Sequence, residues 1–339
     1  MLWAGLVGYR CHGNAIIMRW TVQDPAGNEI TVGLDMTDTA KIKACVVGLG
    51  SMGLGIAGSL LRAGFDVSGC DVSADAMGRF STLGGDTAQT PGAAANGVDV
   101  VISVVVNAMQ TEAVLFGPDG AASQMASGGV ILSCATMAPD AARAFEKKAQ
   151  ALGLMYLDAP ISGGAVRAAA GEMTVMASGA PAAFDRARPV LSAIAAKVYE
   201  LGDEAGTGAA FKIVNQLLAG VHIAAACEAM TFAAAMGLDL PRVYEVITAS
   251  AGNSWMFENR VPHILDGDYA ARSAVDIFTK DLGIVTDIGR ALKFPTPVAA
   301  IAMQMFVMTA AAGMGRDDDA SVARMLAGLS GLDLPGAKA

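Results

Sequence analysis

The segment Gly48-Leu-Gly50-Ser-Met-Gly53 is the feature that most restricts what this 339-residue chain can fold into. It follows a short β-rich run, residues 43–47, and opens a helical stretch over residues 51–63. In that setting the first glycine permits a tight turn, the second lets a phosphate approach the backbone, and the third lets helix and strand pack closely. The helix N-terminus offers unpaired N–H groups to the phosphates. The pattern predicts a dinucleotide-binding βαβ unit, whose contacts come from Gly48, Leu49, Gly50, Ser51, Met52 and Gly53.

Asp71 ends the second predicted strand, residues 67–71, and lies 18 residues after Gly53. A carboxylate roughly 20 residues beyond the glycine loop binds the ribose 2′-hydroxyl of a dinucleotide. The same carboxylate repels a 2′-phosphate, and no Arg or Lys follows before Arg79. We therefore expect the cofactor to be NAD rather than NADP.

Further along the chain, β-rich runs alternate with helical stretches, which is typical of βαβ units and a mainly parallel sheet. After Gly202 only helical patterns remain, interrupted at Gly237, Pro241, Gly252, Pro262, Pro295, Pro297 and Gly313 to Gly315. We therefore expect an α/β domain over residues 41–204 and an all-α domain over residues 205–335. The remaining strands are predicted at residues 98–105, 129–133, 154–159, 174–177 and 197–201.

Residues 1–40 are expected to be an extension that is not part of the fold. Residues 20–32 have the pattern of a hairpin around Pro25-Ala-Gly27, but nothing upstream offers a core to support it. Met36 precedes Thr37-Asp-Thr-Ala, a polar lead into the first strand of the sheet. We expect the folded part to begin near Met36.

The composition restricts the partners and the compartment. Apolar residues make up 53% of the chain, and the longest apolar run, residues 213–236, contains Asn215, Gln216, His222 and Glu228 in its interior. Such residues are costly in a membrane-spanning helix, so we expect a buried, Ala-rich helix of a soluble protein. The net charge of −9 argues against nucleic acid and anionic membranes. Five scattered cysteines and three scattered histidines suggest neither disulfides nor a metal site, and favour the cytoplasm.

Two further segments are candidates for chemistry. In Asp158-Ala-Pro-Ile-Ser162-Gly163-Gly164, two glycines after a serine expose successive N–H groups, which form a nest for a carboxylate; an ordinary turn is the alternative. Lys212 lies on one helix face with Asn215 and Gln216, after an expected N-cap at Thr207. Burial and the positive helix end would lower the pKa of Lys212 into a useful acid–base range, unless it is a surface lysine.

The pair Lys280-Asp281 is by itself typical of a solvated helix face. His222 and His263 are expected to be structural, and the methionines of residues 303–314 are expected to pack in the core.

Together these motifs resemble the β-hydroxyacid dehydrogenase family over residues 42–330. The resemblance implies a Rossmann-type domain and an all-helical domain joined by a long helix, a cleft between them, and a homodimer or homotetramer packed through the helical domain. It implies that Ser162, Gly163 and Gly164 bind the substrate carboxylate, that Lys212 is catalytic, and that Asn215 and Gln216 contact the substrate. It adds Val106, Asn107, Thr136 and Lys280 to the cofactor contacts, although the family's usual proline is absent at Val106.

Residues 212–228 and 251–263 resemble the L-threonate dehydrogenase branch of that family. This implies oxidation of the C2 hydroxyl of L-threonate with NAD, giving 2-dehydro-L-erythronate. A polyhydroxylated acid needs polar partners, and Asn253, Ser254 and Asn259 are candidates for the C3 and C4 hydroxyls.

Three alternatives stay open. A sister dehydrogenase acting on glycerate, tartronate semialdehyde or 3-hydroxyisobutyrate would share the machinery. An imine reductase would share the fold, but enzymes of that type usually lack a lysine at the position of Lys212. A nonenzymatic dinucleotide-sensing protein would leave the nest and Lys212 unexplained.

Overall fold

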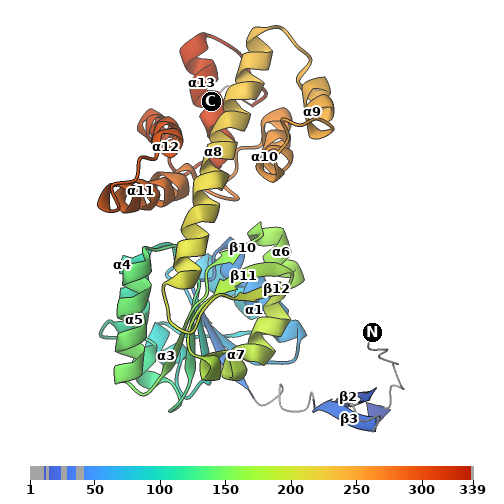
Figure 1. The fold of residues 1–339 in the computed structure, drawn as a ribbon, viewed down its shortest axis with the longest axis vertical. Coiled ribbons are helices and arrows are strands. Elements are labelled where there is room, and N and C mark those ends of the chain that lie inside the picture. Colours follow the sequence, from blue (N-terminus) through green and yellow to red (C-terminus); the bar gives the residue numbers. More distant parts are fainter. Residues whose placement is uncertain (1–10, 13–14, 24–28, 36–41, 337–339) are drawn as a thin grey trace.

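The computed structural model describes residues 11–12, 15–23, 29–35 and 42–336. Most of these residues belong to two parts, a sheet covered by helices and a group of helices, which are connected by the long helix α8, Thr207–Ala235 (Figure 1). The chain therefore has the expected fold class, a Rossmann-type α/β part followed by an all-α part.

The main sheet has six parallel strands in the order β6-β5-β4-β7-β8-β9. The order reverses between β4 and β7, and ligands of doubly wound sheets bind at such a point, beyond the carboxyl ends of the strands. The strand predicted over residues 98–105 is restricted to the four residues of β7, and the others match their predictions more closely. The strands are β4 (Lys43–Val47), β5 (Asp66–Cys70), β6 (Asp86–Thr87), β7 (Val100–Ser103), β8 (Val130–Ser133) and β9 (Met155–Asp158).

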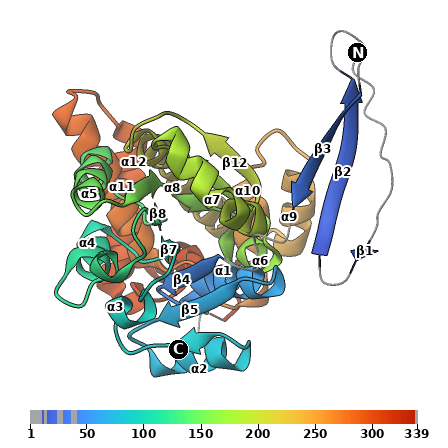
Figure 2. The same ribbon diagram turned by 90° about the horizontal axis from the view of Figure 1, so that it is seen from below.

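Helices cover both faces of this sheet, as Figure 2 shows. Side chains of α1, α2, α6 and α7 pack on one face, and side chains of α3, α4 and α5 pack on the other. Burial on both faces explains why the central strands, β4, β7 and β8, are nearly continuous apolar runs. The helices are α1 (Ser51–Arg62), α2 (Ala74–Thr82), α3 (Pro91–Ala94), α4 (Ala108–Phe116), α5 (Pro139–Ala151), α6 (Gly164–Ala170) and α7 (Pro181–Ile194).

The last three strands form a second sheet rather than extending the first. In it β10 (Ile161–Ser162) pairs antiparallel with β11 (Met173–Ala177), and β11 pairs parallel with β12 (Ala195–Glu200). The expectation of one mainly parallel sheet is therefore corrected for these strands.

Helix α8 is the core of the helical part, where it contacts every following helix. These are α9 (Leu240–Thr248), α10 (Trp255–Asp266), α11 (Val275–Ala291), α12 (Pro297–Thr309) and α13 (Val322–Ser330), with the turns η3 (Ala310–Met314) and η4 (Asp319–Ser321). By length and composition alone, α8 and residues Pro297–Met314 could each cross a membrane, a test that the core helix of a soluble protein also passes.

Pro262 is expected to separate two helices, but it lies inside α10. A proline there removes the hydrogen bond to the carbonyl four residues earlier, that of Glu258. The hydroxyl of Tyr244 donates to this carbonyl instead, at 3.1 Å, so the freed acceptor keeps a partner.

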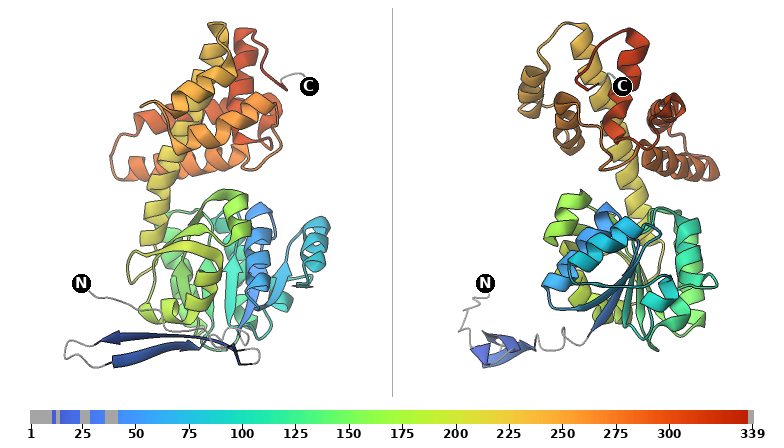
Figure 3. Two further views of the ribbon diagram at one scale, coloured as in Figure 1. Left: turned by 90° about the vertical axis from the view of Figure 1, so that its right-hand side faces the viewer. Right: turned by 180° about the vertical axis from the view of Figure 1, so that it is seen from behind.

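Near the N-terminus, β2 (Ala15–Gln23) and β3 (Glu29–Asp35) pair antiparallel, as expected for a hairpin around residues 25–27, and β1 (Cys11–His12) pairs with β2. Figure 3 shows these strands at the end of the sheet part that lies opposite the helical part. The turn of the hairpin and Met36 lie outside the described residues.

Candidate active site

Five of the motifs found in the sequence follow the carboxyl ends of neighbouring strands. The glycine loop follows β4, Asp71 follows β5, Asn107 comes after β7, Thr136 comes after β8, and Ser162 comes after β9. Because parallel strands end at the same edge of a sheet, these residues lie along one edge, and that edge faces the helical part (Figure 1).

The glycine loop has the geometry that a dinucleotide requires. A Cβ at Gly53 would overlap the carbonyl oxygen of Gly48, which itself has a φ of +93°. At Gly50, in contrast, a Cβ would meet nothing within 4 Å, so the space beside this residue is open. Gly50 is also the N-cap of α1 and provides no side-chain hydrogen bond to its N–H groups. The loop therefore leaves room and free donors for a pyrophosphate.

Asp71 lies directly against this loop. Its Oδ2 accepts a hydrogen bond from the N–H of Leu49 at 2.6 Å, and its Oδ1 accepts one from the N–H of Ser73 at 2.8 Å. The carboxylate is therefore fixed beside the loop, where it can bind ribose hydroxyls and disfavour a phosphate.

Lys280 of α11 reaches across from the helical part to the edge of the sheet. Its Nζ donates hydrogen bonds to the carbonyl oxygens of Val106 at 2.6 Å and Thr136 at 3.1 Å. Three predicted cofactor residues are thus brought together. A fourth, Asn107, caps α4 by accepting a hydrogen bond from the N–H of Gln110 at 2.8 Å.

The expected carboxylate nest lies between β10 and α6. Ser162 pairs with Thr174 in the second sheet, and Gly163 and Gly164 have φ values of +135° and +75°. These left-handed conformations favour glycine. A Cβ at Gly164 would meet nothing within 4 Å, so its backbone can be approached closely.

Lys212 is buried in the second turn of α8, with 8% of its surface exposed. Burial lowers the pKa of its ammonium group to about 8, with Lys280 acting in the same direction and the Asp281 carboxylate opposing them. Thr207 is not the N-cap as expected, because Gly206 occupies that position. The N–H groups of this helix end are bound instead by Asp158 and Ser178 from the sheet part.

A chain of side chains links Lys212's helix face to α11. The amide of Asn215 donates to Gln216 Oε1 at 2.9 Å, and the amide of Gln216 donates to Asp281 Oδ2 at 2.5 Å. Asp281 Oδ1 in turn lies 2.7 Å from the Nζ of Lys280. Gln216 and Lys280 therefore contact one carboxylate, Asn215 is linked to it through Gln216, and the carboxylate also raises the pKa of Lys212.

Asp281 corrects the expectation of a solvated Lys-Asp pair, because only 1% of its side chain is exposed. It is a candidate site residue that the sequence analysis missed. One signal could have found it, since Phe278, Leu282 and Val285 place an apolar stripe on its side of α11.

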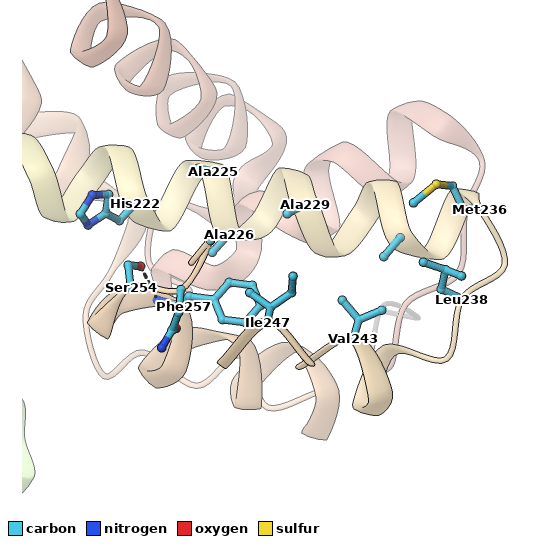
Figure 4. A pocket seen from close by; sticks show the side chains of 13 residues that line it. His222, Ala225, Ala226, Ala229, Met236, Leu238, Val243, Ile247, Ser254 and Phe257 are labelled. Atoms are coloured by element: carbon cyan, nitrogen blue, oxygen red, sulfur yellow. Dashed lines mark hydrogen bonds between the residues drawn. The ribbon is translucent and has the colours of Figure 1, made fainter. Parts of the chain in front are cut away.

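The structure does not group Asn253 and Ser254 with Lys212. Ser254 caps α10 by accepting from the N–H of Phe257 at 3.0 Å, and the amide of Asn253 donates to the carbonyl of Thr248 at 3.1 Å. Both line a cavity of about 520 Å³ between α8, α9 and α10, which Figure 4 shows running from His222 to Leu238. His222 is ten residues beyond Lys212, or about 15 Å along the helix. From His222 the cavity extends along α8 in the direction away from Lys212.

The two histidines of the helical part have different surroundings. His263 is buried, and its Nδ1 lies 2.8 Å from Asp318 Oδ1, in keeping with a structural role. His222 lines the cavity shown in Figure 4.

Asn259, the third candidate for the C3 and C4 hydroxyls, has its Oδ1 bound by the neighbouring side chain of Arg260, which donates a hydrogen bond to it.

Comparison with known proteins identifies families and relatives to which this chain is similar. Residues 43–202 match the family described as the NAD binding domain of 6-phosphogluconate dehydrogenase, and residues 206–326 match the one described as NAD-binding of NADP-dependent 3-hydroxyisobutyrate dehydrogenase. The L-threonate dehydrogenase of Cupriavidus necator is 54% identical over 86% of this chain and 97% of its own length. That of Escherichia coli K12 is 48% identical over 86% of this chain and 96% of its own length.

A solved structure has the same fold as this chain. The crystal structure of 3-hydroxyisobutyrate dehydrogenase from Salmonella typhimurium superposes with a TM-score of 0.81 at 49% sequence identity, covering 84% of this chain and 99% of that chain.

Proposed function

The chain belongs to the β-hydroxyacid dehydrogenase family, and from this premise we propose that it oxidises the C2 hydroxyl of L-threonate with NAD, giving 2-dehydro-L-erythronate. The observation that carries the proposal is a buried lysine with a lowered pKa, Lys212, on the helix that connects the dinucleotide-binding sheet to the helical part. The L-threonate dehydrogenases among its relatives support the choice of substrate.

The substrate's carboxylate is held by the hydroxyl of Ser162 and the N–H groups of Gly163 and Gly164 in this proposal. An anion suits successive backbone N–H groups, and fixing one end of the substrate orients the reacting carbon. Asn215 orients the C2 hydroxyl, while Gln216 holds Asn215 in place and is itself held by Asp281.

Neutral Lys212 takes the proton of the C2 hydroxyl as the C2–H bond breaks and a carbonyl forms. NAD, when bound, supplies the acceptor for the hydride that leaves C2 with the electron pair. In the reverse direction the ammonium group of Lys212 returns a proton to the developing alkoxide. Since burial lowers its pKa to about 8, both forms of Lys212 are accessible near neutral pH.

The cofactor is held along the edge of the sheet in this proposal. The loop from Gly48 to Gly53 takes the pyrophosphate, Asp71 takes the ribose hydroxyls, and Asn107 and the region bridged by Lys280 lie on the nicotinamide side. The open space at Gly50 and the fixed carboxylate of Asp71 both fit such a ligand.

A second candidate is oxidation of 3-hydroxyisobutyrate, because the superposed structure from Salmonella typhimurium carries that name. The distinguishing experiment measures NADH or NADPH formation with L-threonate, D-erythronate, glycerate and 3-hydroxyisobutyrate. We expect the highest kcat/KM for L-threonate with NAD. A higher value for another acid would reject the proposed substrate, and no turnover with any of them would reject the enzyme class.

We also propose that the protein acts as a homo-oligomer in the cytoplasm. Apolar side chains of α8 (Phe211, Val214 and Phe232) and of α12 (Val298 and Ile301) are more than half exposed in the single chain, and burying them would favour association. The four cysteines of residues 42–336 are free and buried, which suits a reducing compartment.

A further inference from the structure

The first turn of α8 is held by side chains of the sheet part and not by its own residues. Asp158, the last residue of β9, is 1% exposed, and its Oδ2 accepts hydrogen bonds from the N–H groups of Gly206 at 2.9 Å and Ala209 at 2.7 Å. Ser178 Oγ accepts one from the N–H of Gly208 at 2.9 Å. The free N–H groups of a helix start need acceptors, and Gly206, the N-cap, has no side chain to supply one.

The backbone of this turn also lies directly on the strands. A Cβ at Gly208 would overlap the carbonyl oxygen of Met176 and would lie 2.7 Å from that of Asp158. Asp158 and Ser178 are themselves paired, since the N–H of each donates to the carbonyl of the other, at 3.0 and 2.9 Å. The start of α8 therefore cannot shift without breaking several of these contacts.

Asp158 is close along the chain to both halves of the candidate substrate site. Ser162, which begins the nest, comes four residues after it, and Lys212 comes three residues after the bound Ala209. The segment between Asp158 and the nest is also fixed, because the N–H of Ala159 donates to the carbonyl of Ser133 and the carbonyl of Pro160 accepts from Met176, both at 2.9 Å.

We propose that Asp158 is a positioning residue that sets the placement of Lys212 relative to the carboxylate nest, because one buried carboxylate caps the lysine's helix and belongs to the segment that leads into the nest. The inference rests on the proposed function, in which the nest and the lysine hold two points of the same substrate. A carboxylate is also the acceptor that the positive end of a helix favours.

The attachment depends on a single oxygen. Oδ1 of Asp158 has no hydrogen-bond partner among the described residues, so Oδ2 alone accepts both backbone N–H groups. Burial raises the pKa of Asp158 to about 6, against the lowering effect of those hydrogen bonds, and the group is therefore ionised above neutral pH, where Lys212 becomes neutral.

The test compares two substitutions at this position. In Asp158→Ala, we expect kcat per NADH-binding site to fall about 10–100-fold, because a displacement of 1 Å can reduce catalysis by this amount. NADH binding should be unchanged, since the glycine loop and Asp71 follow other strands. Asp158→Asn keeps an oxygen that can accept both N–H groups, so it should restore kcat to within about 3-fold of the original protein.

Asp239→Ala is the matched control, because Asp239 also caps a helix, α9, by accepting from the N–H of Arg242 at 3.2 Å. It should lower Tm and leave kcat per NADH-binding site unchanged. Should Asp158→Ala not fold, Ser178→Ala removes the hydrogen bond to Gly208 and should still lower kcat about 3–10-fold. An unchanged kcat per site in the folded variant, or a loss of NADH binding in parallel with activity, would overturn the proposal.

Hydrogen exchange separates this inference from the proposed function. Asp158→Ala should speed amide exchange in residues 206–212 relative to the remainder of α8, and Asp239→Ala should not. If the original protein does not oxidise L-threonate, the proposed function fails, while the faster exchange still supports the attachment of the first turn of α8 by Asp158. If exchange in residues 206–212 is unchanged, this attachment by Asp158 is itself rejected.

Discussion

Two groups of buried charges lie around the helices of this protein, and they differ in how completely each charge is paired. In the first, between α10 and η4, Arg260 binds both carboxylate oxygens of Asp319, at 2.6 and 3.1 Å. His263 and the N–H of Arg272 bind the two oxygens of Asp318 there, at 2.8 and 3.1 Å. We call these residues the α10 ion cluster.

In the second group, which comprises Asp281, Lys280, Gln216 and Lys212 and which we call the Asp281 group, one carboxylate serves several partners. Asp281 Oδ1 lies 2.7 Å from Lys280 Nζ and its Oδ2 lies 2.5 Å from the amide nitrogen of Gln216, and the same carboxylate is the counter-charge that raises the pKa of Lys212. Removing one partner of a buried ion pair is strongly destabilising, whereas a buried lysine with incomplete compensation has a lowered pKa and can exchange a proton. The comparison therefore indicates that the α10 ion cluster stabilises the fold and that the Asp281 group serves catalysis.

The largest expected effect is in the Asp281 group, where Lys212→Ala should reduce kcat by about 10³–10⁴-fold, in line with the loss of a general base. NADH binding and Tm should stay close to those of the original protein, because no hydrogen bond or ion pair within residues 42–336 involves this ammonium group. Steady-state kinetics measures kcat, NADH fluorescence titration measures NADH binding, and thermal unfolding measures Tm. Lys148→Ala, which removes an exposed lysine paired with Glu112, is the control, and near-normal turnover in Lys212→Ala would reject the assigned role.

The next effect is on the other side of the comparison. Asp319→Ala should lower the free energy of unfolding by about 3 kcal/mol, because it leaves the guanidinium of Arg260 buried without its partner. Urea titration measures this value, and kcat per folded molecule should be unchanged. Asp317→Ala is the matched control in the same segment, since Asp317 is 40% exposed in its pair with Arg324, and it should lower the free energy by about 1 kcal/mol or less.

Sequence patterns predicted the fold well because its signals are local. The glycine loop, the alternation of strands and helices, and the change to helices after Gly202 all depend on short segments of the chain. The nest and Lys212 were found in the same way, and their roles remain predictions.

The errors came from contacts between distant residues. Thr207 obeys the local rule for an N-cap, but Asp158, far earlier in the chain, supplies the hydrogen bonds. Lys280-Asp281 has the local pattern of an exposed pair, and only the packing of α11 against α8 buries its carboxylate. Short-range patterns contain no information on such contacts.

A smaller effect should appear in the pH dependence of kcat/KM. For oxidation, kcat/KM should rise about tenfold per pH unit below pH 8 and level off above it, because Lys212 must be neutral to accept a proton. Since the Asp281 carboxylate raises the pKa of Lys212, Asp281→Asn should move this limb to lower pH, together with a loss in kcat of about tenfold from the disturbed Gln216. A limb that stays in place would show that Asp281 does not act on Lys212.

The smallest effect concerns the cavity between α8, α9 and α10. Asn253→Ala should change KM for L-threonate by less than about 2-fold, because its amide binds Thr248 and Glu258, and the cavity runs away from Lys212 along α8. Ser254→Gly should behave alike, since glycine is tolerated at an N-cap. Steady-state kinetics with glycerate, which lacks the fourth carbon, provides the control. A KM increase for L-threonate but not for glycerate would put Asn253 at the C4 hydroxyl, and would mean that the substrate site extends farther into the helical part than the Asp281 group indicates.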